Sequence, residues 1–423
     1  MSAERAVLIT VQLDPRFARD GASWPIEDEA RELAELVTSS GCRVVAEVSA
    51  RRHQPIAGTF LGGGKLEEIA ALVVQHQGQV VIFNHELSPA QQRNIEEAVR
   101  AKTIDRTQLI LDIFAQRARS QEGKVQVELA QLRYLLPRLT GKGVMLSRLG
   151  GGIGTRGPGE QKLEVDRRRI RARITRLGRE LDKLGERRQA TRSRRRETEL
   201  PVVALVGYTN AGKTTLLNKL TGAEGTAQNQ LFTTLDPLAR RLHLSTGEIV
   251  ILTDTVGFLH HLPHHLIEAF KATLEEARDA DILLHVLDVS HPLALEHAEA
   301  VEAVLRQLGL QEKPVVTALN KSDRIEETSR LEVIKRAYEP ACIISARTGQ
   351  GLPQLCELIS RQLDLLLVPP VRLRIPVDRS DVLAATYQNG QVLSRRDANG
   401  VTELLARLPE PCPSLISSYV VDS

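Results

Sequence analysis

Residues 202–215 read VVALVGYTNAGKTT, and this stretch decides the fold of the chain. It joins a short apolar run, typical of a buried strand, to a glycine-rich turn and then to a helical LLNKL pattern. Gly207 and Gly212 fit the spacing G-x-x-x-x-G-K-Ser/Thr, in which glycines let successive backbone N–H groups point at phosphate oxygens. The start of the helix adds partial positive charge. The stretch therefore predicts a phosphate-binding loop between a strand and a helix.

Two side chains in this loop carry specific chemistry. Lys213 would reach the β- and γ-phosphates of a nucleotide as a compact positive charge, and the Thr214 hydroxyl would bind Mg²⁺, which prefers hard oxygen ligands. A plain glycine turn with a surface lysine is the alternative, and the strand and helix on either side argue against it. The expected nucleotide contacts of the loop are Gly207, Tyr208, Thr209, Asn210, Ala211, Gly212, Lys213, Thr214 and Thr215.

Length and composition indicate several ordinary globular domains. The chain has 423 residues, of which 42% are hydrophobic and 26% charged, and the length predicts about three domains. Its four cysteines lack metal-ligand spacing, which argues against a zinc site or a disulfide framework. There is no run of 18 apolar residues and no basic leader, so we expect no transmembrane segment and a cytoplasmic protein, with peripheral membrane association as an alternative location.

The regions before the phosphate loop differ from each other in pattern. Residues 1–119 alternate strand-like and helix-like stretches and predict a small α/β domain, with strands at 7–13, 43–48, 80–84 and 103–105 and helices at 27–39, 65–77 and 89–100. The run Gly62–Lys65 (GGGK) predicts a tight strand-to-helix turn, or alternatively an anion or second nucleotide site.

Residues 120–199 predict an antiparallel helical hairpin. Apolar residues recur at steps of three and four in two segments, 125–139 and 170–184, as in paired heptad seams. A loop with six glycines between Gly150 and Gly159 separates the segments. Residues 164–199 hold 14 Arg or Lys against 7 Asp or Glu, a local charge of +7 in a chain of +3 overall. This basic excess favours binding to the phosphate backbone of structured RNA, and a plain surface coiled coil remains the alternative.

Residues 200–368 continue as alternating strands and helices and predict a mainly parallel sheet. Asp254 would hold Mg²⁺ at a strand end, and the Gly257 N–H would contact the γ-phosphate. The run Asn320–Asp323 (NKSD) follows another strand, where open α/β sheets bind ligands. An Asp carboxylate accepts hydrogen bonds from guanine N1–H and N2–H₂. Adenine N1 is an acceptor and would leave the Asp unpaired, so guanine is preferred. The expected contacts to the base are Asn320, Lys321, Asp323, Ser345 and Ala346.

Residues 369–423 follow a Pro-Pro linker and predict a small α+β domain without catalytic residues. The overall fold class is therefore α/β: a P-loop nucleotide domain preceded by a small α/β domain and a helical hairpin, and followed by a small α+β domain.

Many of these stretches together resemble one family over essentially the whole length. They include FLGGGK at 60–65, DRTQLILDIFAQRA at 105–118, LSRLGGGIGTRGPGE at 146–160, GYTNAGKTT at 207–215, LFTTLDP at 231–237, DTVGFLHHLPHHL at 254–266 and NKSD at 320–323. They resemble HflX, a ribosome-associated GTPase of the translation-factor class. The resemblance implies that the N-terminal domain and hairpin bind the large ribosomal subunit and its rRNA. It further implies a GTPase, stimulated by the ribosome, that splits stalled or idle ribosomes, often under stress.

The resemblance also implies roles for single residues. Thr234 would be the switch threonine that closes on Mg²⁺, with Thr233 as the competing assignment, so the expected metal ligands are Thr214, Thr234 and Asp254. Asn210 matches GTPases of which some use K⁺, a further candidate cofactor beside GTP/GDP and Mg²⁺. The expected catalytic residues are Lys213, Thr234, Gly257 and Asn210.

Phe258 stands where Ras-like GTPases have the glutamine that orients water. Because a phenyl ring cannot orient water, we expect slow intrinsic hydrolysis and a partner that completes the site. Four histidines follow: His260, His261, His264 and His265. Three interpretations stay open for them, namely contacts of the switch loop or with the ribosome, a catalytic histidine, and a metal site. Two rival functions stay open. The first is an RNA-remodelling ATPase, in which residues 62–65 would support a secondary ATPase activity beside the GTPase. The second is a non-ribosomal signalling switch. We expect a monomer.

Overall fold

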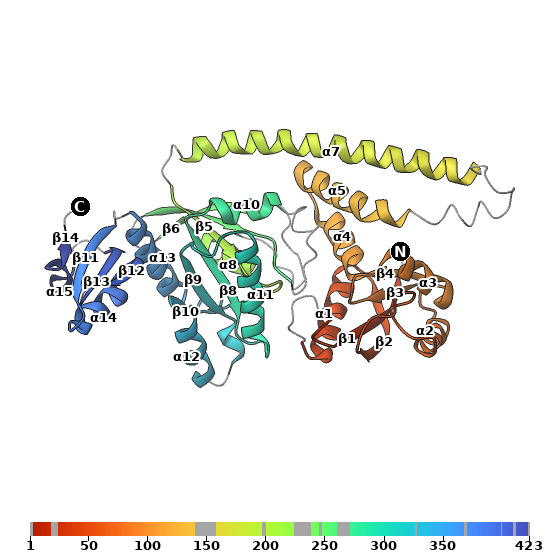
Figure 1. Ribbon diagram of the computed structural model, residues 1–423, viewed down its shortest axis with the longest axis horizontal. Helices are drawn as coiled ribbons and strands as arrows, with labels where there is room; N and C mark the ends of the chain where they lie inside the picture. Colours follow the sequence, from red (N-terminus) through yellow and green to blue (C-terminus); the bar gives the residue numbers. More distant parts are fainter. Residues whose placement is uncertain are drawn as a thin grey trace.

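The computed structural model describes residues 3–17, 24–139, 158–196, 200–223, 238–244, 248–259, 271–325, 328–367, 370–398, 400–408 and 412–421. Within them, three sheets follow one another along the chain, and a helical arm lies between the first and the second (Figure 1). The predicted α/β class is confirmed. None of the helices in these ranges is both long enough and apolar enough to cross a lipid bilayer.

The first sheet is parallel and has the order β2-β1-β3-β4. Successive residues of β1 point to opposite faces: Ala6 and Leu8 join a core with α1 and α4, whereas Val7 and Ile9 join a core with α2 and α3. Strand β1 is therefore buried on both faces of the sheet, whereas the edge strand β2 is partly exposed. The elements are β1 Arg5–Leu13, α1 Ile26–Ser39, β2 Arg43–Arg52, α2 Gly63–Gln75, β3 Val80–Phe83, α3 Pro89–Val99, β4 Lys102–Asp105 and α4 Arg106–Arg117.

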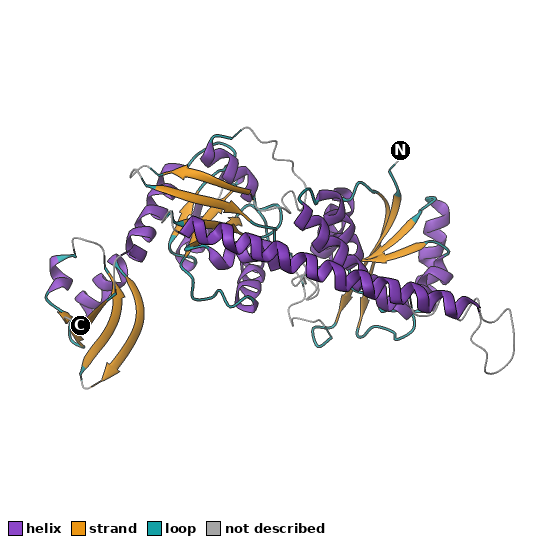
Figure 2. Cartoon of the chain, turned by 90° about the horizontal axis from the view of Figure 1, so that it is seen from above, coloured by secondary structure: helices purple, strands orange, loops and turns teal. Residues whose placement is uncertain are grey.

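The helical arm consists of α5 Gln121–Arg138 and α7 Pro158–Arg196. Helix α7 has 39 residues, which is about 58 Å at 1.5 Å per residue, and it runs past both the first and the second sheet (Figures 1 and 2). Val125 and Leu129 of α5 are buried against Leu177 of α7, so the predicted pairing of the two seams is confirmed. The predicted glycine-rich tip lies almost entirely outside the described residues.

The second sheet has the order β10-β9-β8-β5-β7-β6, and only β6 runs antiparallel to its neighbour. Its faces are covered by separate apolar clusters, as expected for a doubly covered sheet. The carboxyl ends of β5, β7 and β9 therefore meet at one edge. The elements are β5 Val202–Val206, α8 Lys213–Thr221, β6 Leu238–His243, β7 Ile249–Asp254, α10 Lys271–Asp279, β8 Ile282–Asp288, α11 Ala294–Gln307, β9 Val315–Asn320, α12 Thr328–Ala337, β10 Ala341–Ile343 and α13 Leu352–Leu367.

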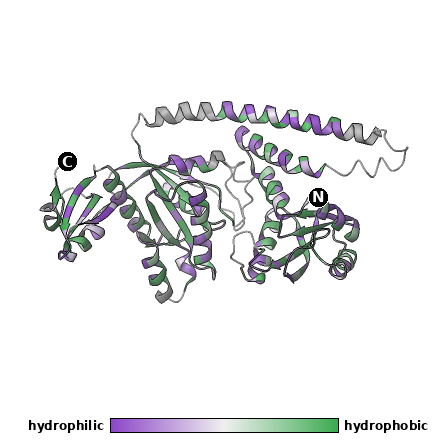
Figure 3. Cartoon of the chain, in the orientation of Figure 1, coloured by the Kyte–Doolittle hydropathy of each residue, from purple (hydrophilic) through white to green (hydrophobic). Residues whose placement is uncertain are grey.

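The third sheet is antiparallel, with the order β12-β13-β11-β14. Its apolar residues form a small core of their own around Leu373 and Leu404. Figure 3 shows hydrophobic residues following the strands of all three sheets, while the coloured middle part of α7 is mostly hydrophilic. The last elements are β11 Val371–Pro376, α14 Ser380–Asn389, β12 Gln391–Ala398, β13 Val401–Arg407, α15 Ser414–Ser417 and β14 Val420–Val421.

Candidate nucleotide-binding site

The phosphate loop requires glycine at two positions for steric reasons. A Cβ atom on Gly207 would lie 2.4 Å from the Val286 carbonyl oxygen, and one on Gly212 would lie 2.4 Å from the Asn320 amide nitrogen. Gly212 also has a φ of 99°, a left-handed conformation that glycine adopts at little cost. These contacts fix the tight turn that ends β5 and starts α8.

Lys213 is buried inside this turn. Its ammonium donates to the carbonyl oxygens of Gly207 at 3.0 Å and Tyr208 at 2.9 Å. Burial lowers the pKa of Lys213 to about 8, and the nearby Asp254 carboxylate opposes that shift. Since this pKa still lies above neutral pH, the side chain carries its charge at the centre of the loop.

A pair of hard oxygen ligands lies beside this lysine. Strand β7 pairs with β5 so that Asp254 stands opposite Leu205, which brings the carboxylate to the phosphate loop. The Thr214 hydroxyl donates to Asp254 Oδ2 at 2.8 Å. A hydroxyl and a carboxylate so close together fit the oxygen chemistry that Mg²⁺ prefers.

The segment after Asp254 lies directly against the phosphate loop. Thr209 N–H donates to the Phe258 carbonyl at 2.8 Å, and Phe258 N–H donates to the Gly207 carbonyl at 3.1 Å. A Cβ on Gly257 would lie 2.8 Å from Thr209 Cα. The Phe258 ring is 2% exposed, within an apolar cluster. The residue that replaces the water-orienting glutamine is therefore part of the core.

The predicted base contacts come together at the ends of β9 and β10. Asn320 accepts from Ala346 N–H at 2.9 Å and donates to the Ala211 carbonyl at 2.8 Å, which ties the base-binding run to the phosphate loop. Asp323 accepts from the Ser345 hydroxyl at 2.7 Å, and this hydrogen bond holds the pKa of Asp323 below its usual value. Asp323 is therefore ionised at neutral pH, as an acceptor for guanine N–H groups must be.

The remaining predicted residues are either placed near this site or lie outside the described residues. Thr215 lies in the first turn of α8, and Lys321 forms an ion pair with Asp288 at 2.6 Å. Thr233, Thr234 and the histidines 260, 261, 264 and 265 lie outside the described residues, so their roles stay predictions.

Sequence reasoning missed Gly351, where a Cβ would lie 2.2 Å from the Ile343 carbonyl oxygen. The available signal was the run Gly349–Gly351 (GQG), which begins three residues after the Ser345–Ala346 pair that follows a strand.

The N-terminal sheet domain contacts the phosphate loop directly. The Glu32 carboxylate accepts hydrogen bonds from the Tyr208 hydroxyl and from the Arg106 guanidinium. The Tyr208 ring stacks on the His297 imidazole, with 3.9 Å between centroids and 3° between planes, and Trp24 packs near both. The two domains therefore share a buried contact at the nucleotide site that no sequence pattern indicated.

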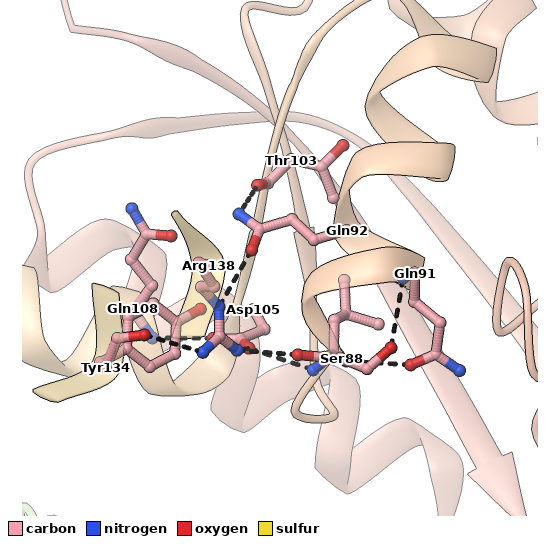
Figure 4. A network of polar contacts seen from close by, with 9 residues as sticks. Ser88, Gln91, Gln92, Thr103, Asp105, Gln108, Tyr134 and Arg138 are labelled. Atoms are coloured by element: carbon pink, nitrogen blue, oxygen red, sulfur yellow. Dashed lines mark hydrogen bonds and ion pairs between the residues drawn. The ribbon is translucent and has the colours of Figure 1, made fainter. Parts of the chain in front are cut away.

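A second buried network connects the start of α4 with the end of α5 (Figure 4). The Asp105 carboxylate accepts from Gln108 N–H at 2.9 Å, from Leu87 N–H at 3.0 Å and from Arg138 at 3.0 Å. The Arg138 guanidinium also lies 3.4 Å from the centroid of the Tyr134 ring. Because Asp105 precedes Arg106, the residues that fasten the arm adjoin the arginine that bonds Glu32, which in turn contacts Tyr208 of the phosphate loop.

Because two histidines are buried, we expect acid to lower the free energy of unfolding. Burial lowers the pKa of His297 to about 3 and that of His285 to about 4, so their stabilisation is complete above about pH 6.5 and decreases as pH falls. Between pH 7.5 and 5 each should cost about 2 kcal/mol. We expect His297→Phe, measured by urea unfolding at both pH values, to remove one such contribution.

His243→Phe is the matched control, because it makes the same replacement at an exposed histidine. Glu29 acts in the opposite direction, since burial raises its pKa to about 7, but it is present in all three proteins and cancels in the comparison. If His297→Phe loses as much stability at pH 5 as the natural chain, the histidine does not stay neutral in the fold.

Three family models match the chain in order: the GTP-binding GTPase N-terminal model at residues 27–115, the GTP-binding GTPase middle region at 117–195, and the 50S ribosome-binding GTPase model at 202–321. Together they cover most of the chain before residue 322.

Individual relatives agree with these matches. The GTPase HflX of Caldanaerobacter subterraneus subsp. tengcongensis is 49% identical over 85% of this chain and 81% of its own length. The GTPase HflX of Escherichia coli K12 is 42% identical over 96% of this chain and 94% of its own. Among solved structures, a GTP-binding protein from Sulfolobus solfataricus in complex with GDP is 26% identical, covers 85% of this chain and 99% of its own, and has a TM-score of 0.46.

Proposed function

Because this chain belongs to the HflX GTPase family, binds guanine nucleotide and hydrolyses GTP, we propose that it couples this hydrolysis to binding of the large ribosomal subunit. The relevant family model is named for 50S ribosome-binding GTPases, and the arm supplies a matching surface. Binding to rRNA through the arm and the N-terminal domain would separate stalled or idle ribosomes into subunits.

The observation that carries this proposal is the basic face of α7. Arg168, Arg171 and Arg179 are all exposed, and their spacing of 3 and 8 residues places them on one side of the helix, away from the seam with α5. Guanidinium groups in such a row neutralise successive phosphates of a nucleic-acid backbone. Because α7 runs along both the first and the second sheet (Figure 1), this charge would lie beside the N-terminal and nucleotide domains.

The nucleotide site supports a switch between GTP-bound and GDP-bound forms. Thr214 and Asp254 would hold Mg²⁺, with Thr234 joining them, and bound Mg²⁺ would neutralise charge on the β- and γ-phosphates. K⁺ near Asn210 is a further proposed cofactor. Gly257 and Thr234 would move onto the γ-phosphate and be released when it is lost.

The test is the GTPase rate of the full chain with and without purified large ribosomal subunits. Because Phe258 is buried and offers no polar group to an attacking water, we expect slow hydrolysis alone and strong stimulation by the subunit. Purified small subunits are the matched control. An unchanged rate with large subunits would contradict the proposal. We further propose that the chain acts as a cytoplasmic monomer.

The contacts at residues 62–65 favour a tight turn into a helix over a second nucleotide site. Gly63 and Gly64 form the first turn of α2, and the Lys65 ammonium lies 2.9 Å from both carboxylate oxygens of Glu68. These contacts give no support to a secondary ATPase activity, which stays a prediction. A non-ribosomal signalling role also stays a prediction.

Asp323→Asn should change the nucleotide preference. An asparagine presents an N–H₂ group to guanine N1–H and N2–H₂ in place of an acceptor, whereas the N1–H and O2 of xanthine can pair with it. We expect GTP affinity to fall at least tenfold and xanthosine triphosphate to become the better ligand, measured by competition against a fluorescent GDP. Asp378→Asn, in the C-terminal domain, is the control. Full retention of the GTP preference would exclude Asp323 as the base contact.

A further inference from the structure

A cleft opens where the first turn of the phosphate loop meets helix α1 of the N-terminal domain. The cleft is lined by Thr209 and Asn210 of the loop, by Asp28, Arg31 and Glu35 of α1, and by Asp288 and His291 at and after the end of β8. Asp28, Arg31 and Glu35 recur at steps of three and four, so they share one face of α1. This face of the N-terminal domain therefore shares a cleft with two residues of the loop that is expected to bind the phosphates of GTP.

Two carboxylates around this cleft are held by close contacts. Glu32 is bonded to Tyr208 and Arg106, and Asp288 is paired with Lys321 at 2.6 Å. Arg31 differs from these, because one nitrogen meets Asp28 at 3.2 Å and its side chain is 58% exposed. Surface pairs of this kind hold a side chain weakly.

We propose that Arg31 is a catalytic residue that reaches over Thr209 and Asn210 to the β- and γ-phosphates of bound GTP. The inference rests on nucleotide binding at the phosphate loop and does not require the ribosome. Helix α1 would thus supply from the N-terminal domain the positive charge that many GTPases receive from a separate activating protein. The pair with Asp28 would hold the guanidinium beside the site until GTP binds.

The reaction needs this charge at one position. The oxygen of the attacking water forms a bond to the γ-phosphorus while the bond from phosphorus to the bridging oxygen breaks. The electron pair of the broken bond stays on the β-phosphate of GDP, and the proton lost by the water ends on the released phosphate. Negative charge therefore grows on the bridging oxygen, where a planar guanidinium donates hydrogen bonds well. The buried Phe258 contributes no polar group to this step.

The test compares Arg31→Ala, Arg31→Lys and the control Arg51→Ala in the full chain without ribosomes, because Arg51 is exposed on β2 in the same domain. We expect Arg31→Ala to lower kcat at least tenfold with GDP affinity within twofold, and Arg31→Lys to restore little, because lysine lacks the planar fork. Arg31→Ala should also fail to bind aluminium fluoride in the presence of GDP.

Asp28→Asn separates a catalytic from a structural role. If Arg31 acts on the phosphates, releasing it from Asp28 should keep or raise kcat, whereas a structural ion pair would make both variants equally slow. A kcat for Arg31→Ala within twofold of the natural chain would overturn the proposal. So would an unchanged kcat with weakened GDP binding. Loss of GDP binding in the unsubstituted chain would instead refute nucleotide binding at the loop.

Discussion

Lys213→Ala should abolish GTP turnover and lower GTP affinity at least a hundredfold. The Lys213 ammonium lies at the centre of the phosphate loop and is held there by two loop carbonyls. It would donate charge-assisted hydrogen bonds to two phosphates, each contributing about 1.5–3 kcal/mol, and about 3 kcal/mol in total already corresponds to a hundredfold change in affinity. Titration with a fluorescent GTP analogue and an assay of phosphate release would measure both effects.

Lys65→Ala is the matched control for this prediction, because Lys65 also follows glycines at the start of a helix but pairs with Glu68. It should leave GTP binding and turnover unchanged. Normal GTP binding by Lys213→Ala would refute the phosphate-loop assignment. ATP turnover that survives Lys213→Ala but is lost in Lys65→Ala would identify residues 62–65 as a second nucleotide site.

Replacing Arg168, Arg171 and Arg179 together by glutamine should strongly weaken binding to the large ribosomal subunit. If each guanidinium neutralises one phosphate, the slope of log affinity against log salt should become shallower by about two to three units. Cosedimentation with large subunits at a series of salt concentrations measures this slope. Glutamine keeps the helix propensity close to that of arginine, so α7 should remain folded.

A second triple variant removes the same amount of charge elsewhere. Arg278, Arg306 and Arg336 are exposed on helices of the nucleotide domain, and replacing them by glutamine should leave the salt slope nearly unchanged. If both triple variants behave alike, binding depends on net charge and the basic face of α7 has another purpose. Arg173 is left intact in both, because it bonds Glu128 of α5 at 2.8 and 2.9 Å.

Local elements could be predicted from the sequence, with small errors at their ends. The predicted helix at 65–77 begins two residues earlier, at Gly63, because Leu66, Ile69 and Val73 bury against the first sheet and their packing outweighs the low helix propensity of glycine. The predicted strand at 43–48 continues to Arg52, since β2 pairs with β1 along its full length. In both places a partner distant in sequence set the boundary.

The sequence indicated which residues lie together in the candidate site better than it indicated the surfaces around that site. Asp254 and Asn320 end strands of one mainly parallel sheet and Asp323 follows soon after the second of them, and the geometry of that sheet brings strand ends together. The heptad seams likewise indicated that α5 and α7 pair. The sequence did not indicate that Arg173, within the basic run, forms an ion pair across that seam.

The phosphate loop at 207–215 and the choice of guanine follow from the sequence by itself, because glycine spacing and strand-end residues encode local backbone geometry and hydrogen-bond chemistry. Only the tertiary structure decided that Glu32 meets Tyr208, 176 residues later, and that Arg31 lines the cleft above that loop. The physical reason is that periodicity predicts which face of α1 is apolar and which is polar. The surface that packs against the polar face depends instead on how two folded domains meet.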